Sequence, residues 1–177
     1  MKFTETRLRG VFIIDLERHE DRRGFFARSF CSKEFAAHGL PSNFVQCNTS
    51  YNRRRGTLRG MHFQAAPCEE GKLVRATRGA IVDIVIDLRP LSPTRREWLS
   101  FDLSDANGRA LYIPPGLAHG FQTLSDHAEV LYQMTEFYAP GLARGIRWND
   151  PAFGLQWPIA SPILSEQDAS FPNFEFA

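Results

Sequence analysis

Short strand-like segments recur along almost the whole chain, and this pattern constrains its fold more than any other feature. The segments are rich in β-branched and aromatic residues and are separated by turn sequences such as Arg78-Gly79 and Pro114-Pro115-Gly116. The predicted strands cover residues 11–16, 24–30, 44–51, 57–64, 72–77, 80–88, 98–103, 110–113, 119–124, 129–138 and 145–148. Many short antiparallel strands predict an all-β sandwich or barrel, and a jelly-roll barrel of two antiparallel sheets fits their number.

The segment 80–88 shows the clearest alternation. Ile81, Asp83, Val85 and Asp87 share one strand face, and Val82, Ile84, Ile86 and Leu88 share the other. We expect the wholly apolar face to pack between the sheets, while the two carboxylates face solvent, a partner or a pocket.

Helices are few. We predict one over 32–38, with Ser32 as its N-cap and Gly39 as its stop, and a short second one that begins at Ser165. A chain of 177 residues without repeats or long linkers is expected to form one domain over 1–177.

Composition argues against several classes of partner. The net charge is +1, so no strong positive field favours nucleic acid. No apolar run approaches the ~20 residues of a membrane span, and the N-terminus lacks a signal-peptide pattern. The three cysteines form no CxxC pair, which argues against a disulfide framework or a zinc ribbon. We expect a cytoplasmic protein that contacts neither nucleic acid nor membrane.

The segment Leu58-Arg59-Gly60-Met61-His62-Phe63-Gln64 carries a lone histidine in a predicted strand. His62 and Gln64 share one face and Arg59 lies on the other, although a bulge at Gly60 would bring Arg59 and His62 to the same side. This histidine is either a proton-transfer base or a structural residue bonded to the backbone.

Other polar residues have an ordinary and a functional interpretation. Gln46 and Asn48 share a strand face, and so do Tyr132 and Tyr138. Alone, Tyr132 is a core aromatic, Lys72 a surface lysine and Asp168 a carboxylate at a helix start. Only their convergence would favour catalysis.

A metal site is the competing hypothesis. Jelly rolls of the cupin type usually hold a metal with a His-x-His pair, a Glu and a further His, but here the pair position reads His62-Phe63-Gln64. Glu69 or Glu70 and His119 could still supply ligands, although three scattered donors make a poor transition-metal site. We therefore predict no metal.

Several motifs, in order from about residue 10 to residue 168, resemble the dTDP-4-dehydrorhamnose 3,5-epimerase family. They are Asp21-Arg22-Arg23-Gly24-Phe25-Phe26, Phe44-Val45-Gln46-Cys47-Asn48, the segment around His62, Gly71-Lys72-Leu73-Val74-Arg75, Ile113-Pro114-Pro115-Gly116-Leu117-Ala118-His119-Gly120-Phe121, Gly145-Ile146-Arg147-Trp148-Asn149-Asp150-Pro151 and Pro162-Ile163-Leu164-Ser165-Glu166-Gln167-Asp168. The resemblance implies a cupin-type jelly roll without metal or cofactor that works as a homodimer with strand exchange. It also implies an epimerase that inverts carbon 3, carbon 5 or both in a nucleotide-linked 4-keto-6-deoxyhexose.

The resemblance assigns roles to individual residues. It implies that His62 is the base, Asp168 its partner, Tyr132 the acid on the opposite face and Lys72 the cation at the enolate oxygen. Asp83 is a second candidate partner for an active-site histidine or lysine. The residues that match substrate-holding positions are Arg23, Arg59, Gln46, Asn48 and His119, with Tyr138, and Phe26 of a partner chain, stacking on the nucleobase.

One residue departs from the family pattern at a position near the nucleobase. Where the family commonly has an acidic residue after the Gly-Phe-Phe run, this chain has Arg28. A carboxylate can accept the thymine ring N–H, whereas arginine only donates. We hypothesise from this that Arg28 binds another base such as cytosine; the alternative is that Arg28 points away and pairs elsewhere.

Four alternatives to the double epimerase follow. One is a single-centre epimerase, and another is a ketoisomerase, either of which could act on a CDP-linked sugar. A third is a non-catalytic cupin that binds a sugar nucleotide, and the least favoured is a metal-dependent cupin oxygenase.

Overall fold

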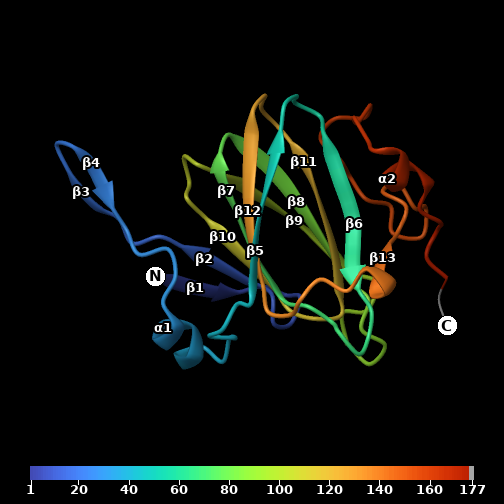
Figure 1. Cartoon of the computed structure of the whole chain (residues 1–177), viewed down its shortest axis with the longest axis horizontal. Coiled ribbons are helices and arrows are strands. Elements are labelled where there is room, and N and C mark those ends of the chain that lie inside the picture. The colour runs from blue at the N-terminus through green and yellow to red at the C-terminus, as the bar shows by residue number, and fades with distance from the viewer. Residues whose placement is uncertain (176–177) are drawn as a thin grey trace.

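Two antiparallel sheets face each other and enclose the core, as Figure 1 shows for the computed structural model, which describes residues 1–175. The six-stranded sheet has the order β1 (Lys2–Glu5), β2 (Phe12–Asp15), β10 (Ala110–Ile113), β7 (Lys72–Arg78), β12 (Ala128–Met134) and β5 (Gln46–Asn52). The five-stranded sheet has the order β13 (Ala143–Gly145), β6 (Leu58–Gln64), β11 (Leu117–Thr123), β8 (Ala80–Asp87) and β9 (Trp98–Ser104). The predicted jelly roll of two antiparallel sheets is confirmed; residues 176 and 177 of the expected domain lie outside the described residues.

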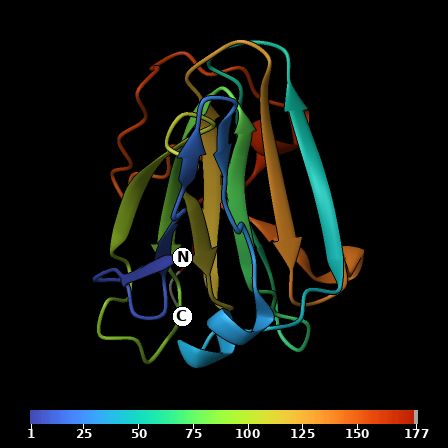
Figure 2. The same ribbon diagram turned by 90° about the vertical axis from the view of Figure 1, so that its left-hand side faces the viewer.

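A separate hairpin, β3 (His19–Asp21) with β4 (Gly24–Phe26), projects away from the sheets (Figure 1) and lies in front of them in Figure 2. The few helical turns are short: α1 (Ser32–Ala37), the 3-10 turn η1 (Pro140–Leu142) and α2 (Glu166–Ser170). In residues 1–175 no helix combines the length and apolar character that a membrane crossing requires.

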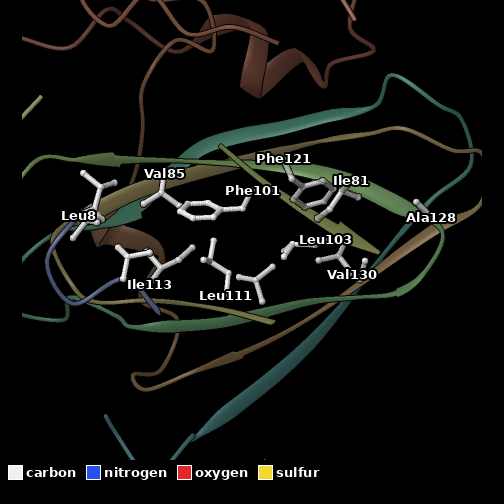
Figure 3. Packing of buried hydrophobic residues seen from close by; sticks show 14 residues of the cluster. Leu8, Ile81, Val85, Phe101, Leu103, Leu111, Ile113, Phe121, Ala128 and Val130 are labelled. Carbon is white, nitrogen blue, oxygen red and sulfur yellow. The ribbon is translucent and has the colours of Figure 1, made fainter. Parts of the chain in front are cut away.

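The main core lies between the sheets. Val85 and Phe101 of the five-stranded sheet pack there with Leu111, Ile113 and Val130 of the six-stranded sheet (Figure 3). A second cluster lies on the outer face of the five-stranded sheet, where Val82, Ile84 and Ile86 pack with Ile146 and Phe153 of the C-terminal segment. A third buries Phe35 of α1 against the six-stranded sheet.

This packing corrects the expectation for strand 80–88. The apolar face of β8 lies outside the barrel, under the C-terminal segment, and the face that carries Asp83 and Asp87 turns toward the interior. Both carboxylates are fully buried. The prediction was wrong because strand parity separates two faces but does not show which one a distant segment covers.

Several boundaries also differ from the prediction. The strands β1 and β3 were not expected, β4 ends at Phe26, and the strand expected over 145–148 is β13, which ends at Gly145. Helix α1 begins at Ser32, so its N-cap is Cys31, which makes no side-chain cap bond. Gly39 follows the helix at φ +70°, as expected of its stop. The short second helix was expected to begin at Ser165, but α2 begins at Glu166 and Ser165 is its N-cap, where Ser165 Oγ accepts the Asp168 N–H at 3.0 Å.

Candidate active site

A pocket of about 520 Å³ opens between the sheets and gathers most of the predicted site residues. Its wall includes Gln46, Asn48, Lys72 and Tyr132 from the six-stranded sheet, Arg59, His62 and His119 from the five-stranded sheet, and Tyr138 from the segment after β12. A cavity of this size, lined by both apolar and convergent polar groups, suits a small-molecule ligand.

Strand register explains why the residues of the six-stranded sheet converge. Tyr132 on β12 pairs with Asn48 on β5. Two residues further, Met134 pairs with Gln46 on β5 and Lys72 on β7. Residues paired across antiparallel strands share a face, so all of these side chains point between the sheets.

On the facing sheet, His62 of β6 pairs with His119 of β11. The next pair joins Phe121 to Arg59, so β6 holds one more residue than β11 here, which is the bulge predicted at Gly60. Gly60 has φ +129°, and a Cβ there would lie 2.5 Å from the Gly120 Cα. The bulge requires glycine and brings Arg59 to the pocket side, where Arg59 Nε donates to Asn52 Oδ1 at 2.8 Å.

The side chain of His62 is paired with Asp168 from α2. His62 Nε2 lies 2.6 Å from Asp168 Oδ1, and the Ser165 hydroxyl donates to the other carboxylate oxygen at 2.9 Å. Burial raises the pKa of Asp168, but the hydrogen bonds from His62, Ser165 and the Gly60 backbone outweigh it, so the pKa is lowered. A carboxylate that accepts from Nε2–H leaves His62 Nδ1 with a lone pair, as a general base requires.

His119 forms a second histidine–carboxylate pair, deeper in the fold. Its Nδ1 lies 3.2 Å from Asp83 Oδ2, so Asp83 is the partner of His119 and not of His62. Burial lowers the pKa of His119, and the attraction of Asp83 only partly offsets this effect. His119 is therefore neutral at neutral pH, and with Nδ1–H donated to Asp83 its Nε2 can accept a hydrogen bond.

The six-stranded sheet supplies a cation, Lys72, and a phenol, Tyr132. Lys72 Nζ forms an ion pair with Glu70 Oε1 at 2.9 Å, and both side chains are about nine-tenths buried. Burial raises the pKa of Tyr132; the charge of Arg59 opposes this effect and that of Glu70 adds to it. Tyr132 is thus a neutral phenol with a proton to donate.

Three of the predicted substrate-binding residues lie outside the pocket of their own chain. Arg23 and Phe26 are on the projecting hairpin, where Arg23 pairs with Asp21 at 2.6 Å and Phe26 is 75% exposed. Arg28 follows the hairpin and pairs with Glu34 at 2.8 Å. This contact agrees with the alternative in which Arg28 pairs elsewhere.

Some lining residues were not singled out from the sequence. Arg144 and Phe171 line the pocket, and the Phe171 ring lies edge-on to His62 with ring centroids 5.8 Å apart. Gly145 leaves room for this ring, since a Cβ there would lie 2.3 Å from it. No periodicity marks Phe171, because it belongs to an irregular C-terminal segment.

Tyr138 lines the pocket, but not for the reason that predicted it. It lies beyond the end of β12, so strand parity does not determine its position. Its backbone N–H donates to Gln46 Oε1 at 3.1 Å.

The donor set does not favour a metal. Within residues 1–175, no group of three or more His, Cys, Asp or Glu side chains is arranged to hold a metal ion. Asp83, Asp168 and Glu70 each pair with a basic side chain instead.

A molecule bound between the sheets would have a histidine base on one face and a phenol with a lysine on the other. This arrangement suits removal of a proton next to a carbonyl and its return from the opposite side. The fold and the pocket thus define a cupin-like jelly-roll protein equipped for acid–base chemistry.

Comparison with known proteins narrows this class. The family model for dTDP-4-dehydrorhamnose 3,5-epimerase matches residues 5–175. The dTDP-4-dehydrorhamnose 3,5-epimerase of Pseudomonas aeruginosa is 45% identical, with 95% of this chain and 93% of that protein covered. The chain therefore belongs to the dTDP-4-dehydrorhamnose 3,5-epimerase family, whose members are isomerases.

Solved structures of epimerases are also similar to this chain. A Bacillus anthracis dTDP-4-dehydrorhamnose 3,5-epimerase with TDP and PPi bound has a TM-score of 0.95 and 40% identity, covering 98% of this chain and 99% of its own. A Legionella pneumophila epimerase in complex with dTDP-4-keto-L-rhamnose has a TM-score of 0.91 and 36% identity, covering 97% and 92%. A 3'-monoepimerase from Streptomyces bikiniensis is more distant, at 30% identity and a TM-score of 0.88, covering 95% and 85%.

Proposed function

We propose that this protein epimerises a dTDP-linked 4-keto-6-deoxyhexose at carbons 3 and 5. The observation that carries the proposal is the His62–Asp168 pair, at 2.6 Å, on one wall of a pocket whose facing wall holds Tyr132 and Lys72. Inversion requires a base and an acid on opposite faces of the reacting carbon, and the two sheets supply them.

The reaction follows from the chemistry of a ketone. The carbonyl at carbon 4 acidifies the C–H bonds on carbons 3 and 5, so His62 Nδ1 can take a proton while the bond electrons form an enolate. Asp168 stabilises the resulting imidazolium, and the Lys72 ammonium stabilises the enolate oxygen. Tyr132 then donates its proton to the opposite face of the carbon, and the nearby charge of Arg59 favours the phenolate that remains.

The cycle closes by exchange with solvent. After each inversion His62 holds one extra proton and Tyr132 lacks one. The His62 side chain is 42% exposed, so its proton can pass to water, and Tyr132, which lines the pocket, takes a replacement proton from water. Every inverted carbon should therefore carry a proton that came from the solvent.

The residues that would hold the nucleotide, and the base that it carries, are proposed from the similarity to relatives. Gln46, Asn48, Arg59, His119 and Tyr138 line the pocket and are proposed to hold the substrate. The TDP and dTDP-sugar bound in the relatives support thymidine as the base. The cytosine hypothesis that Arg28 suggested stays a prediction, as does the cytoplasmic location.

The similarity to a 3'-monoepimerase makes a single-centre epimerase the second candidate. The remaining alternatives, a ketoisomerase and a non-catalytic cupin, have no specific observation in their favour. The whole of 1–177 is proposed to act as one domain, because β1 and the segment around α2 pack on the same two sheets.

Solvent-deuterium uptake tests the proposal. In D₂O, dTDP- and CDP-linked 4-keto-6-deoxyglucose are incubated with the enzyme, and NMR follows carbons 3 and 5. We expect deuterium at both carbons with the dTDP sugar, and a loss of about 10²–10⁴-fold in His62→Ala. His127→Ala is the matched control, since His127 bonds Tyr51 at the surface.

Each outcome has a distinct meaning. Exchange no faster than in His62→Ala would reject the epimerase. Label at one carbon only would establish the single-centre enzyme, and faster exchange of the CDP sugar would reject thymidine.

A homodimer completes the proposal. The hairpin β3–β4 projects from the two sheets (Figure 1), its Phe25 and Phe26 are 51% and 75% exposed, and neither Arg23 nor Phe26 lines the pocket of its own chain. Exposed aromatic residues of this kind favour burial in a partner. We expect the hairpin to reach the pocket of a second copy, where Arg23 and Phe26 would contact the nucleotide.

A further inference from the structure

Asp168, the proposed partner of His62, belongs to a short element in a largely irregular part of the chain. It is the third residue of α2, which spans only the five residues Glu166–Ser170. An aspartate side chain rotates about two bonds and carries two equivalent oxygens, so the backbone alone does not decide which oxygen meets the imidazole. A further group is needed to hold the carboxylate in line with His62 Nε2.

Ser165 is bonded to Asp168 in two ways. Its hydroxyl donates to Asp168 Oδ2 at 2.9 Å, and the same hydroxyl oxygen accepts the Asp168 N–H at 3.0 Å. Ser165 thus ties the carboxylate to the backbone of its own residue and leaves Oδ1 for His62 Nε2, at 2.6 Å. The Asp168 side chain is 6% exposed, so these bonds form largely out of contact with bulk water.

The position of Ser165 is itself fixed to β6, the strand that carries the proposed base. Two residues before Ser165, Ile163 donates its N–H to Gly56 O at 2.8 Å and accepts the Leu58 N–H at 2.9 Å. Leu58 is the first residue of β6. A path of covalent and hydrogen bonds therefore runs from the start of β6 through Ser165 and Asp168 and back to the base, although 106 residues separate the base from its carboxylate.

We propose that Ser165 is a positioning residue, whose hydroxyl holds the Asp168 carboxylate with Oδ1 in line with His62 Nε2–H during proton transfer. This role rests on the proposed function, because it acts on the proposed base. When His62 takes a proton, its new charge meets a carboxylate that does not have to reorient. Ser165 does not line the pocket, so it acts on the reaction only through Asp168. Its bond is also one of those that lower the pKa of Asp168, which keeps the carboxylate ionised.

Steady-state kinetics of Ser165→Ala test the proposal, since this variant lacks the hydroxyl but keeps both Asp168 and His62. We expect kcat to fall about tenfold to a hundredfold, the effect of one hydrogen bond to a charged group. The KM for the dTDP-linked 4-keto sugar should stay nearly unchanged, because Ser165 is not in the pocket wall. Ser165→Thr keeps a hydroxyl that can both donate and cap the helix, so it should restore most of kcat.

Ser170→Ala is the matched control. Ser170 is in the same helix and its hydroxyl donates to Gln167 O at 2.8 Å, so the variant removes a hydroxyl bond from α2 without touching Asp168. We expect its kcat to equal that of the wild type. The proposal is overturned if Ser165→Ala keeps the wild-type kcat, if both alanine variants lower kcat alike, or if Ser165→Thr restores nothing.

Proton NMR separates this proposal from the proposed function. The bond between His62 Nε2–H and Asp168 is short, at 2.6 Å, so its proton should resonate far downfield and be absent in His62→Ala. We expect this resonance to broaden or move upfield in Ser165→Ala and to stay in place in Ser165→Thr and Ser170→Ala. If the wild type exchanges no deuterium into any 4-keto sugar, the epimerase is rejected, while this resonance still reports on Ser165. An unchanged resonance in Ser165→Ala would reject the positioning role even in an active enzyme.

Discussion

His62 and His119 are cross-strand neighbours, yet their surroundings give them different properties. His62 is partly exposed and its carboxylate comes from α2, so it can take a proton and exchange it with water. His119 is buried with Asp83, and burial lowers its pKa. A neutral, fixed imidazole suits substrate binding, which is the role that the family resemblance implies for it.

Tyr132→Phe should separate the two halves of the reaction. The variant keeps the His62 base but has no proton to donate from the other face. We expect deuterium still to enter the substrate through His62 with retention of configuration, while inversion falls by about 10²–10⁴-fold. NMR of the sugar in D₂O reports both rates at once.

The control for this variant is Tyr51→Phe, which removes an exposed hydroxyl outside the pocket. If Tyr132→Phe inverts carbons at the wild-type rate, Tyr132 is not the acid. Because burial raises the pKa of Tyr132 above its ordinary 10, its loss of a proton should not reduce inversion between pH 7 and 9.

Only part of the site could be predicted from residues alone. Strand parity placed His62 with Gln64 and Gln46 with Asn48, and Gly60 indicated the bulge. Asp168 is 106 residues from His62, so no spacing rule joins them, and its assignment came from family resemblance. The ion pair between Glu70 and Lys72 was not predicted, because Glu70 belongs to an irregular segment before β7 whose path no periodicity shows.

At the scale of elements, β8 shows what alternation determines and what it leaves open. Its limits were predicted to within one residue, but the side that faces the interior was not. The C-terminal segment covers the outer face of the sheet, so both faces of β8 are buried. Its two carboxylates are then satisfied locally, Asp83 by His119 and Asp87 by the turn that follows the strand.

Asp87→Asn should destabilise the fold in a pH-dependent way. Burial raises the pKa of Asp87, but bonds from Arg89, Ser92 and Thr94 overcome it and lower the pKa from 3.8 to about 2. A lowered folded-state pKa means stabilisation that is complete above pH 3.8 and lost as the pH falls through about 2. At pH 7 a loss of roughly 2 kcal/mol would lower the Tm by about 4–8 °C.

Thermal unfolding followed by circular dichroism from pH 7 to pH 2 measures this effect. The Tm difference between wild type and Asp87→Asn should shrink below pH 4 and vanish near pH 2. Asp102→Asn, at an exposed position on β9, should change the Tm little at any pH. A difference that stays constant with pH would contradict the role given to the Asp87 carboxylate.

At the scale of the whole molecule, the two sheets supply the residues that line the proposed sugar site. Arg23 and Phe26, which were predicted to contact the nucleotide, lie instead on a projecting hairpin. One chain thus gathers the proposed catalytic groups in its pocket and exposes the other two predicted binding residues on its surface. The sequence could not show this separation, because it depends on the direction in which the hairpin leaves the two sheets (Figure 1).

Mixed dimers test whether the hairpin serves a second copy. Phe26→Ala and His62→Ala chains, each expected to be impaired alone, are coexpressed with different tags and the mixed dimer is purified. If the hairpin crosses, one of its two sites combines an intact His62 with an intact Phe26, so about half of the wild-type activity should return. No recovery in a purified mixed dimer would reject the crossing.

The position of Asp168 in the chain has a consequence for synthesis. The proposed base, His62 on β6, is synthesised 106 residues before its carboxylate partner on α2, and the segment around α2 also covers the outer face of the sheet. A nascent or prematurely terminated chain could assemble both sheets and still lack a competent base. Enzymatic activity should therefore require that translation has passed Asp168, and a truncation just before Asp168 should leave a protein able to bind nucleotide but unable to turn it over.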